Sequence, residues 1–205
     1  MTVTGLDKIY DLVDRDDAKS LYGAWAQDYD RELSGNGYVT PDRCAAALAS
    51  CTADLAGPVA DFGCGTGLSG EALARAGFTC VDGYDLSSEM LTEAGKKAVY
   101  RSLDTLDLSG PMDHLPGDAY AGVAAIGVLN AAFMPPETID AMLGLLPSGG
   151  HMVCSLNDRQ LADGRMETRI LELTEYNVAD LVFKEHGPHL PGRGLQSTVY
   201  VLRTP

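Results

Sequence analysis

The sequence predicts an α/β fold in which helices cover both faces of a mostly parallel sheet. Short apolar segments typical of strands alternate with segments whose apolar residues recur at helical spacing. The run Ala119–Leu129 is almost unbroken in apolar character, as expected for a central parallel strand buried on both faces. With 205 residues, of which 45% are hydrophobic, the chain is long enough for one such domain and short for two.

Two helices are expected before the first strand. The first covers residues 16–33 and is ended by the glycine-rich segment 34–37. Its apolar and aromatic side chains at three- and four-residue spacing form one stripe: Leu21, Tyr22, Trp25, Ala26 and Tyr29. Thr40 is predicted to be the N-cap of the second helix, with Pro41 at its first position, and this helix should run to about Ala53.

Strands and helices are then expected to alternate from residue 58 onward. In chain order they are strand 58–62, helix 68–76, strand 78–84, a helix from Ser87 to Gly95, strand 98–103, strand 119–129, a helix starting near Pro135, strand 151–156 and helix 165–175. The helix boundaries fall where Gly, Pro or Ser stands in the sequence. Parallel strands joined by helices bind ligands beyond their carboxyl ends, so the site is expected there.

The C-terminal part of the chain breaks this alternation. Segments 179–185 and 197–203 are predicted strands, and the linker 186–194 between them is too short for a crossover helix. Two strands joined in this way should pair antiparallel. The sequence therefore predicts a parallel sheet that ends in an antiparallel hairpin.

Charge and cysteine content limit the partners and the compartment. The net charge of −14 repels phosphate backbones and disfavours nucleic acid as a partner. The N-terminal segment lacks the apolar stretch of a signal peptide, and no run is long enough to span a bilayer. The cysteines contain no C-x-x-C pair, which favours reduced thiols over disulfides or a metal site: Cys44, Cys51, Cys64, Cys80 and Cys154. We therefore expect a cytoplasmic protein with no metal and no membrane partner.

A glycine-rich turn, Val59–Gly70, joins the first strand of the alternating part to its helix. The stretch Gly65-Thr-Gly-Leu-Ser-Gly70 matches the G-x-G-x-x-G pattern of dinucleotide sites, a match that is weak when taken alone. Asp61 would repel a pyrophosphate but attract a ligand with an ammonium group and a sulfonium centre. Asp85, at the end of the second strand, can accept hydrogen bonds from the ribose hydroxyls of either ligand. Asp61 therefore favours an S-adenosylmethionine-type ligand over NAD.

Four motifs resemble those of the class I S-adenosylmethionine-dependent methyltransferases. They are Tyr22-Gly-Ala-Trp-Ala-Gln-Asp-Tyr-Asp30, Val59-Ala-Asp-Phe-Gly-Cys-Gly-Thr-Gly67, Gly83-Tyr-Asp-Leu-Ser-Ser-Glu-Met-Leu91 and Leu146-Pro-Ser-Gly-Gly150. The stretches Val81-Asp-Gly-Tyr-Asp-Leu-Ser87 and Lys97-Ala-Val-Tyr-Arg101 are most similar to the Williams-Beuren region methyltransferase-like branch. The resemblance extends from about Tyr22 to Leu202, which is nearly the whole chain.

This resemblance implies a Rossmann-like three-layer sandwich with a seven-stranded sheet of order 3-2-1-4-5-7-6, in which strand 7 is antiparallel. It implies one domain, with residues 1–56 forming helices that cover the cofactor and residues 57–205 forming the core. The implied cofactor is S-adenosylmethionine, and the implied acceptor is a small molecule. The chain is expected to be a monomer or a homodimer.

The matched positions also imply roles at the cofactor. Asp61 would hold the methionine ammonium group through water, and Asp85 would bind the ribose diol. Asp107 is the matching position for accepting a hydrogen bond from the adenine amino group, with Asp104 as the alternative. The glycine loop beneath the methionine would be formed by Gly63, Cys64, Gly65 and Gly67. The remaining contacts would come from Leu86 and Met90 at the adenine, Leu108 beside Asp107, Ile126 under the transferable methyl group, and Tyr22 and Tyr29 in the covering helix.

The acceptor side of the site is left open by the sequence. The segment 130–133 departs from the family pattern where relatives build an acceptor pocket. The histidines are interpreted as structural or surface residues, so no catalytic base is named: His114, His151, His186 and His189. Two alternatives remain, an NAD(P)-dependent oxidoreductase, disfavoured because no Tyr-x-x-x-Lys is present, and a catalytically silent S-adenosylmethionine-binding protein.

Overall fold

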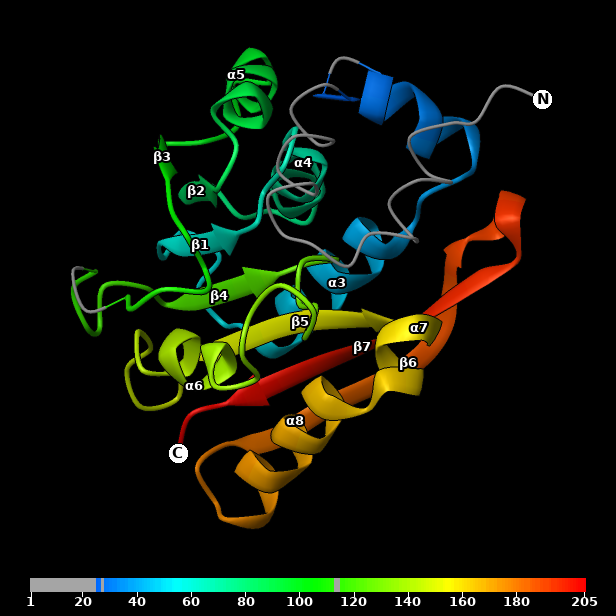
Figure 1. Cartoon of the computed structure of the whole chain (residues 1–205). Helices are drawn as coiled ribbons and strands as arrows, with labels where there is room; N and C mark the ends of the chain where they lie inside the picture. The colour runs from blue at the N-terminus through cyan, green and yellow to red at the C-terminus, as the bar shows by residue number, and fades with distance from the viewer. Residues whose placement is uncertain (1–24, 27, 113–114) are drawn as a thin grey trace.

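The computed structural model describes residues 25–26, 28–112 and 115–205, so Tyr22, His114 and much of the first expected helix lie outside the described residues. One seven-stranded sheet has the order β3-β2-β1-β4-β5-β7-β6 (Figure 1). Its strands are β1 (Val59–Phe62), β2 (Val81–Asp85), β3 (Ser102–Thr105), β4 (Gly122–Ala125), β5 (His151–Asn157), β6 (Asp180–Leu190) and β7 (Leu195–Arg203). This order confirms the predicted fold.

The directions of the strands determine which edge of the sheet can bind a ligand. Strands β1 to β5 pair in parallel, so their carboxyl ends meet at the same edge of the sheet. Strand β7 runs antiparallel to both β5 and β6, as the C-terminal pattern predicts. The hairpin is longer than expected because β6 continues through Leu190 and a 3₁₀ turn, η1 (Pro191–Arg193), leads into β7.

Two layers of helices enclose the sheet (Figure 1). The helices are α3 (Thr40–Cys51), α4 (Leu68–Arg75), α5 (Ser88–Lys96), α6 (Thr138–Leu143), α7 (Asp158–Asp163) and α8 (Arg165–Glu175), and residues 28–35 are also helical. One core cluster joins α3 and α4 to the face of the sheet that carries Val59, Val81 and Val153. A second cluster joins α6 and α8 to the opposite face, which carries Phe62 and Met152.

Several element boundaries differ from the expected ones for local reasons. Strand β3 begins at Ser102 rather than residue 98, because Ala98 has a left-handed φ of 53° and turns the chain out of α5. Strand β4 ends at Ala125, and Gly127 with a φ of 71° then turns the apolar run away from the sheet. Within the described residues, no helix has the length and apolar character that crossing a bilayer would require.

The start of α3 also differs from the prediction. Val39 is the N-cap residue, and Pro41 lies in the first turn. Thr40 is therefore not the cap. Its buried hydroxyl Oγ1 instead lies 2.8 Å from Nδ1 of His189, near the end of β6. This contact ties the N-terminal side of the core to the C-terminal hairpin.

Candidate functional site

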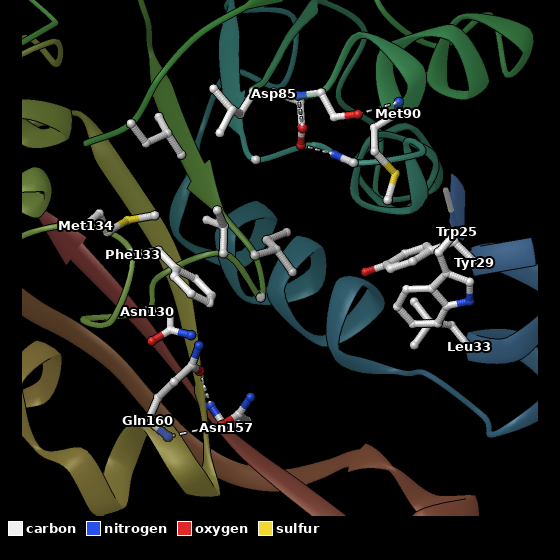
Figure 2. A pocket seen from close by; sticks show the side chains of 18 of the residues that line it. Trp25, Tyr29, Leu33, Asp85, Met90, Asn130, Phe133, Met134, Asn157 and Gln160 are labelled. Atoms are coloured by element: carbon white, nitrogen blue, oxygen red, sulfur yellow. Dashed lines mark hydrogen bonds between the residues drawn. The ribbon is translucent and has the colours of Figure 1, made fainter. Parts of the chain in front are cut away.

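A cavity opens at the carboxyl edge of the sheet, where β1, β2, β4 and β5 end (Figure 2). Its walls come from segments far apart in the sequence. The helical segment near residue 29 contributes Trp25, Tyr29 and Leu33, which lie on one side in Figure 2. Asp85 and Met90 come from the end of β2 and from α5. The cavity is therefore at the position expected for a ligand of an open parallel sheet.

The glycine loop places bare backbone on the cavity wall. Gly63 and Gly65 both line the cavity and have left-handed φ values of 68° and 54°. Among the described residues, no atom outside the neighbouring residues lies within 4 Å of where a Cβ atom of Gly65 would stand, whereas a Cβ atom at Gly63 would clash with the Val128 side chain. Gly65 is thus bare toward the open cavity, and Gly63 is bare because another segment packs against it.

Two loop residues do not line the cavity. Gly67 is the residue before α4, and a Cβ atom there would lie 3.1 Å from both Lys97 and Tyr100. Its lack of a side chain serves packing between the loop and the segment after α5. The Cys64 side chain is buried, and this burial raises the pKa of its thiol well above the usual range. Neither Cys64 nor Gly67 is part of the cavity wall that a ligand would touch.

Asp61 lies behind the loop instead of on the cavity wall. Successive residues of β1 point to opposite faces, and Asp61 points to the face covered by α3 and α4. Its Oδ2 atom accepts hydrogen bonds from Ser69 Oγ at 2.6 Å and from Tyr100 Oη at 2.8 Å. The side chain is fully buried, which raises the pKa of the carboxyl group to about 6. Asp61 therefore braces the glycine loop and does not face the ligand space directly.

Asp85 joins the loop to the cavity. Its Oδ2 accepts a hydrogen bond from the backbone N–H of Gly65 at 2.9 Å, and its Oδ1 accepts one from the N–H of Ser87 at 2.9 Å. Burial raises the pKa of this carboxyl group, although the backbone donors oppose the shift. A carboxylate has about four acceptor positions, so further lone pairs can accept from ligand hydroxyl groups. Leu86 and Met90 line the same wall.

Four other predicted residues are also brought to the cavity. Asp107 and Leu108 line it after β3, and Oδ1 of Asp107 accepts hydrogen bonds from the N–H and Oγ of Ser109. Ile126 lines it directly after β4. Tyr29 packs edge-on against Trp25, with ring centroids 4.7 Å apart. The structure therefore gathers positions that the sequence separates by almost 100 residues.

An ion-pair cluster ties the helical segment 28–35 to the loop. Oδ1 of Asp30 accepts a hydrogen bond from Thr66 Oγ1 at 2.5 Å, and Oδ2 lies 2.8 Å from Lys97 Nζ. The same ammonium group lies 2.6 Å from Oε2 of Glu71 in α4. Lys97 is 13% exposed, so this ammonium group is held well inside the surface. These contacts keep the aromatic side chains of the helical segment over the cavity.

His189 is a cavity residue that sequence reasoning assigned to the surface. It is buried, it packs edge-on against Tyr38 with centroids 5.2 Å apart, and both residues line the cavity. Its Nδ1 meets Thr40 Oγ1, which lies 3.1 Å from Ser197 Oγ. Burial lowers the pKa of the imidazole to about 4, so the ring is neutral at pH 7. No sequence signal marks His189, because it depends on β6 extending further than its pattern indicates.

A group of uncharged residues at the far end of the cavity was also missed. Asn130 and Phe133 follow β4, Asn157 ends β5, and Gln160 lies in α7 (Figure 2). The Asn157 side chain accepts from the N–H of Gln160, and Gln160 accepts from the N–H of Asn157, which forms a capping box. The spacing Asn-x-x-Gln was the available signal for this helix.

The charge of the cavity is restricted in sign. Among the described residues that line it, the charged side chains are Asp85 and Asp107, and none is a lysine or an arginine. Across the described part of the chain, no group of three or more metal-ligating side chains is found. The cavity is therefore suited to a ligand that carries hydroxyl or amino donors and few negative charges.

Comparisons with known proteins agree with this geometry. A family model described as "Methyltransferase domain" matches residues 38–199. Among solved structures, the chain is similar to the magnesium protoporphyrin IX methyltransferase of Synechocystis with bound S-adenosylhomocysteine: TM-score 0.64, 21% identity, covering 86% of this chain and 87% of that one. No curated protein matches the chain.

Two other solved structures share the fold. One is the putative methyltransferase complexed with the Trm112 activator of Haloferax volcanii, with TM-score 0.70, 17% identity and coverage of 90% and 97% of the two chains. The other is the N-methyltransferase NodS of Bradyrhizobium japonicum in complex with S-adenosylhomocysteine, with TM-score 0.57, 19% identity and coverage of 73% and 79%. At these identities the likeness establishes a shared architecture.

Proposed function

This chain belongs to the methyltransferase domain family, and on that premise we propose that it transfers the methyl group of S-adenosylmethionine to a small-molecule acceptor. One observation carries the proposal. The cavity presents the backbone of Gly65 beside the carboxylate of Asp85, and the described lining has no cation that could neutralise a phosphate. A nucleoside ligand without phosphates fits this combination.

The residues present fit the proposed cofactor. The open space at Gly65 would admit the methionine portion, and Asp85 would accept from the ribose hydroxyls. Leu86 and Met90 would pack on the adenine, and Asp107 would accept from its amino group. Ile126 and Tyr29 would lie toward the sulfonium end. When bound, S-adenosylmethionine would supply an electrophilic methyl group on a positively charged sulfur.

The chain's own contribution would be alignment and exclusion of water. The aromatic residues of the helical segment near Tyr29 cover the cavity, and the contacts of Asp30 with Thr66 and Lys97 hold that segment in place. Holding the acceptor in line with the methyl group removes several kcal/mol from the barrier, of the order known for oriented reactants.

The acceptor and the branch of the family are also part of the proposal. A cavity covered by Trp25 and Tyr29 suits a compact acceptor, and the net charge of −14 disfavours nucleic acid. The sequences of the motifs support the Williams-Beuren region branch. Of the N-terminal residues 1–56, the segment 28–35 would cover the cofactor, whereas α3 packs into the core that residues 57–205 form. The five free cysteines suit a reducing compartment such as the cytoplasm.

The nicotinamide alternative is less well supported by the same features. Dinucleotide-binding sheets have the order 3-2-1-4-5-6, whereas this sheet places an antiparallel β7 between β5 and β6. The two carboxylates on the cavity wall would face the phosphates of NAD without a neighbouring cation among the described residues.

Calorimetric titration tests the proposal. S-adenosylhomocysteine and S-adenosylmethionine should bind with micromolar dissociation constants, and NAD should give no heat. Asp85→Ala should weaken S-adenosylhomocysteine binding about tenfold or more, because it removes a charged acceptor for the ribose. Asp104→Ala is the matched control, since Asp104 is an exposed carboxylate on the neighbouring strand. Binding of NAD without S-adenosylhomocysteine would overturn the proposal.

A further inference from the structure

Three amide side chains define the end of the cavity that lies away from Asp85. Asn130 follows β4, Asn157 is the last residue of β5, and Gln160 is in the first turn of α7. Figure 2 shows them together beside Phe133, across the cavity from Asp85 and Met90. All three are partly buried cavity residues rather than fully exposed ones. An uncharged polar surface is therefore built from three separate positions.

Backbone donors fix the orientation of each amide. Asn130 Oδ1 accepts from the N–H of Ala132 at 3.0 Å. Gln160 Oε1 accepts from the N–H of Asn157 at 2.7 Å, while Asn157 Oδ1 accepts from the N–H groups of Arg159 and Gln160 at 3.1 Å each. If the oxygen and nitrogen of any of these amides were exchanged, the side-chain NH₂ group would face a backbone N–H group, and both are donors. Each amide oxygen therefore stays on the backbone side.

The amide nitrogens are consequently the groups left for a ligand. Throughout the described part of the chain, no protein oxygen accepts a hydrogen bond from the NH₂ group of Asn130, Asn157 or Gln160. Each NH₂ group carries two N–H donors and no acceptor. These NH₂ groups can donate hydrogen bonds to a ligand but cannot accept them.

The sheet order separates this surface from the nucleoside wall. Asp85 ends β2, on one side of β1, whereas the amides follow β4 and β5 on the other side. On the proposed function, the β2 side is occupied by the nucleoside of the cofactor. The amide end is then available to the methyl acceptor.

The chemistry of the amides selects the acceptor. A protonated amine would place its own N–H donors against theirs. A phosphate or other multiply charged anion would find no cation among the described lining residues and would be repelled by Asp85 and Asp107. A carbonyl oxygen carries two lone pairs without a full charge and matches such donors. The rings of Phe133 and Tyr38 line the same cavity and favour a flat molecule.

We propose that the NH₂ groups of Asn130, Asn157 and Gln160 form a hydrogen-bond-donating subsite that binds a carbonyl oxygen of the methyl acceptor, and that the acceptor is a neutral, planar, conjugated carbonyl compound. This inference rests on the proposed function, because it takes the β2 side of the cavity to be the nucleoside site. It adds the substrate class to that function.

A matched pair of small compounds tests the inference directly. 2,4-Dihydroxyacetophenone and 4-ethylresorcinol differ only at the first side-chain carbon, which is a carbonyl group in the first compound and a methylene group in the second. Both are titrated into the full chain saturated with S-adenosylhomocysteine, and binding is measured by saturation-transfer NMR and calorimetry. The ketone should bind about tenfold more tightly, the value of one well-placed hydrogen bond of about 1.4 kcal/mol.

Isosteric variants identify the donors. Asn130→Asp and Gln160→Glu keep the oxygens that accept from Ala132 and Asn157, so the local backbone bonds persist, but each replaces NH₂ by oxygen. The ketone should lose about tenfold or more in affinity in each variant, and the preference over 4-ethylresorcinol should disappear. Asn177→Asp adds the same charge at an exposed residue outside the cavity and should change neither affinity.

The outcomes separate this inference from the proposed function. Equal affinity for the two compounds, or no binding of the ketone at millimolar concentration to the S-adenosylhomocysteine complex, would overturn the substrate class. Loss of S-adenosylhomocysteine affinity in Asn130→Asp or Gln160→Glu would assign the amides to the cofactor and would also overturn it. If the unchanged chain bound no S-adenosylhomocysteine, the proposed function itself would fail.

Discussion

Among single residues, Gly65 shows two separate reasons why a position requires glycine: the backbone conformation and the space beside it. Its φ of 54° favours glycine whatever surrounds it, and the space beyond its Cα is open cavity. Gly149 has a φ of 80° and equally open space, but it is exposed in the turn before β5 and outside the cavity. The two positions therefore share the backbone strain and differ in what a side chain would displace.

We predict that Gly65→Val abolishes S-adenosylhomocysteine binding, whereas Gly149→Val retains it. Both variants should lose about 1–2 kcal/mol of unfolding free energy, because valine at positive φ is strained. Calorimetry on the folded variants and urea unfolding measure the two effects separately. Equal binding by the two variants would show that no ligand approaches residue 65.

The buried carboxyl of Asp61 makes stability depend on pH. Its pKa is about 6 in the folded chain against an ordinary value of 3.8, with burial as the main cause. Between these values the folded chain keeps a proton that the unfolded chain releases, so this group's contribution to stability falls as pH rises through the window. A shift of this size corresponds to about 3 kcal/mol at most, at pH values above 6.

Asp61→Asn should therefore gain stability relative to the unchanged chain as pH rises from 4 to 7. Asparagine carries no charge there, and its oxygen can still accept from Ser69 or Tyr100. Urea unfolding at several pH values measures the difference between the two proteins, and the exposed Asp104→Asn serves as control. Parallel stability curves for Asp61→Asn and the unchanged chain would contradict this account.

The sequence indicates which residues lie near the site better than it indicates where their side chains point. Asp85, Asp107 and Ile126 line the cavity because each stands at or just after the end of a strand, and Met90 lines it from the first turn of the helix that follows β2. Asp61 is also near a strand end, yet the alternation of β1 turns it behind the loop. A one-residue difference in strand register decides between these outcomes, and strand boundaries read from sequence are less accurate than that.

At the scale of elements, α5 begins with a cap that also supports the site. Ser87 Oγ accepts from the N–H of Met90 at 3.2 Å and donates to Glu89, while the Ser87 N–H bonds Asp85. Ser87 was predicted to start this helix, and the structure confirms it. The same turn therefore fixes the start of α5 and the carboxylate on the cavity wall.

Ser87→Ala should lower the unfolding free energy by about 1 kcal/mol through loss of the cap. Ser88→Ala is the neighbouring control, because among the described residues its exposed hydroxyl bonds the Glu89 side chain and caps no backbone group. S-adenosylhomocysteine affinity should stay within about threefold in both, since the N–H that bonds Asp85 is backbone. Urea unfolding that finds equal losses in the two variants would contradict the capping role.

The elements that were misplaced share a physical cause. Strand β4 is shorter than its apolar run because the following residues line the cavity wall, as Ile126 and Val128 do, and need apolar side chains there too. Helix α7 was missed because it is short and none of its residues is buried, so it carries no apolar stripe. A run of apolar residues indicates that a segment is buried, but it does not distinguish a strand from a loop that lines a cavity.

For the molecule as a whole, the alternation of strands with helices predicts the α/β class, and the two C-terminal strands with their short linker predict the antiparallel pair. They could not give the lateral order, because nothing in the local pattern says that β7 lies between β5 and β6. That order came from the resemblance of four motifs to a known family, and the structure confirms it. The acceptor end could not be predicted, since Asn130, Asn157 and Gln160 meet only through folding.

The position of β7 has a consequence for biosynthesis. Residues 195–203 follow every other strand in the chain, yet β7 pairs with β5 on one side and β6 on the other. A ribosome that has released only residues up to about 190 holds a nascent sheet whose β5 edge is still bare. Because an unpaired strand edge can recruit strands from other chains, the nascent protein stays open to edge-to-edge association until residues 195–203 have emerged.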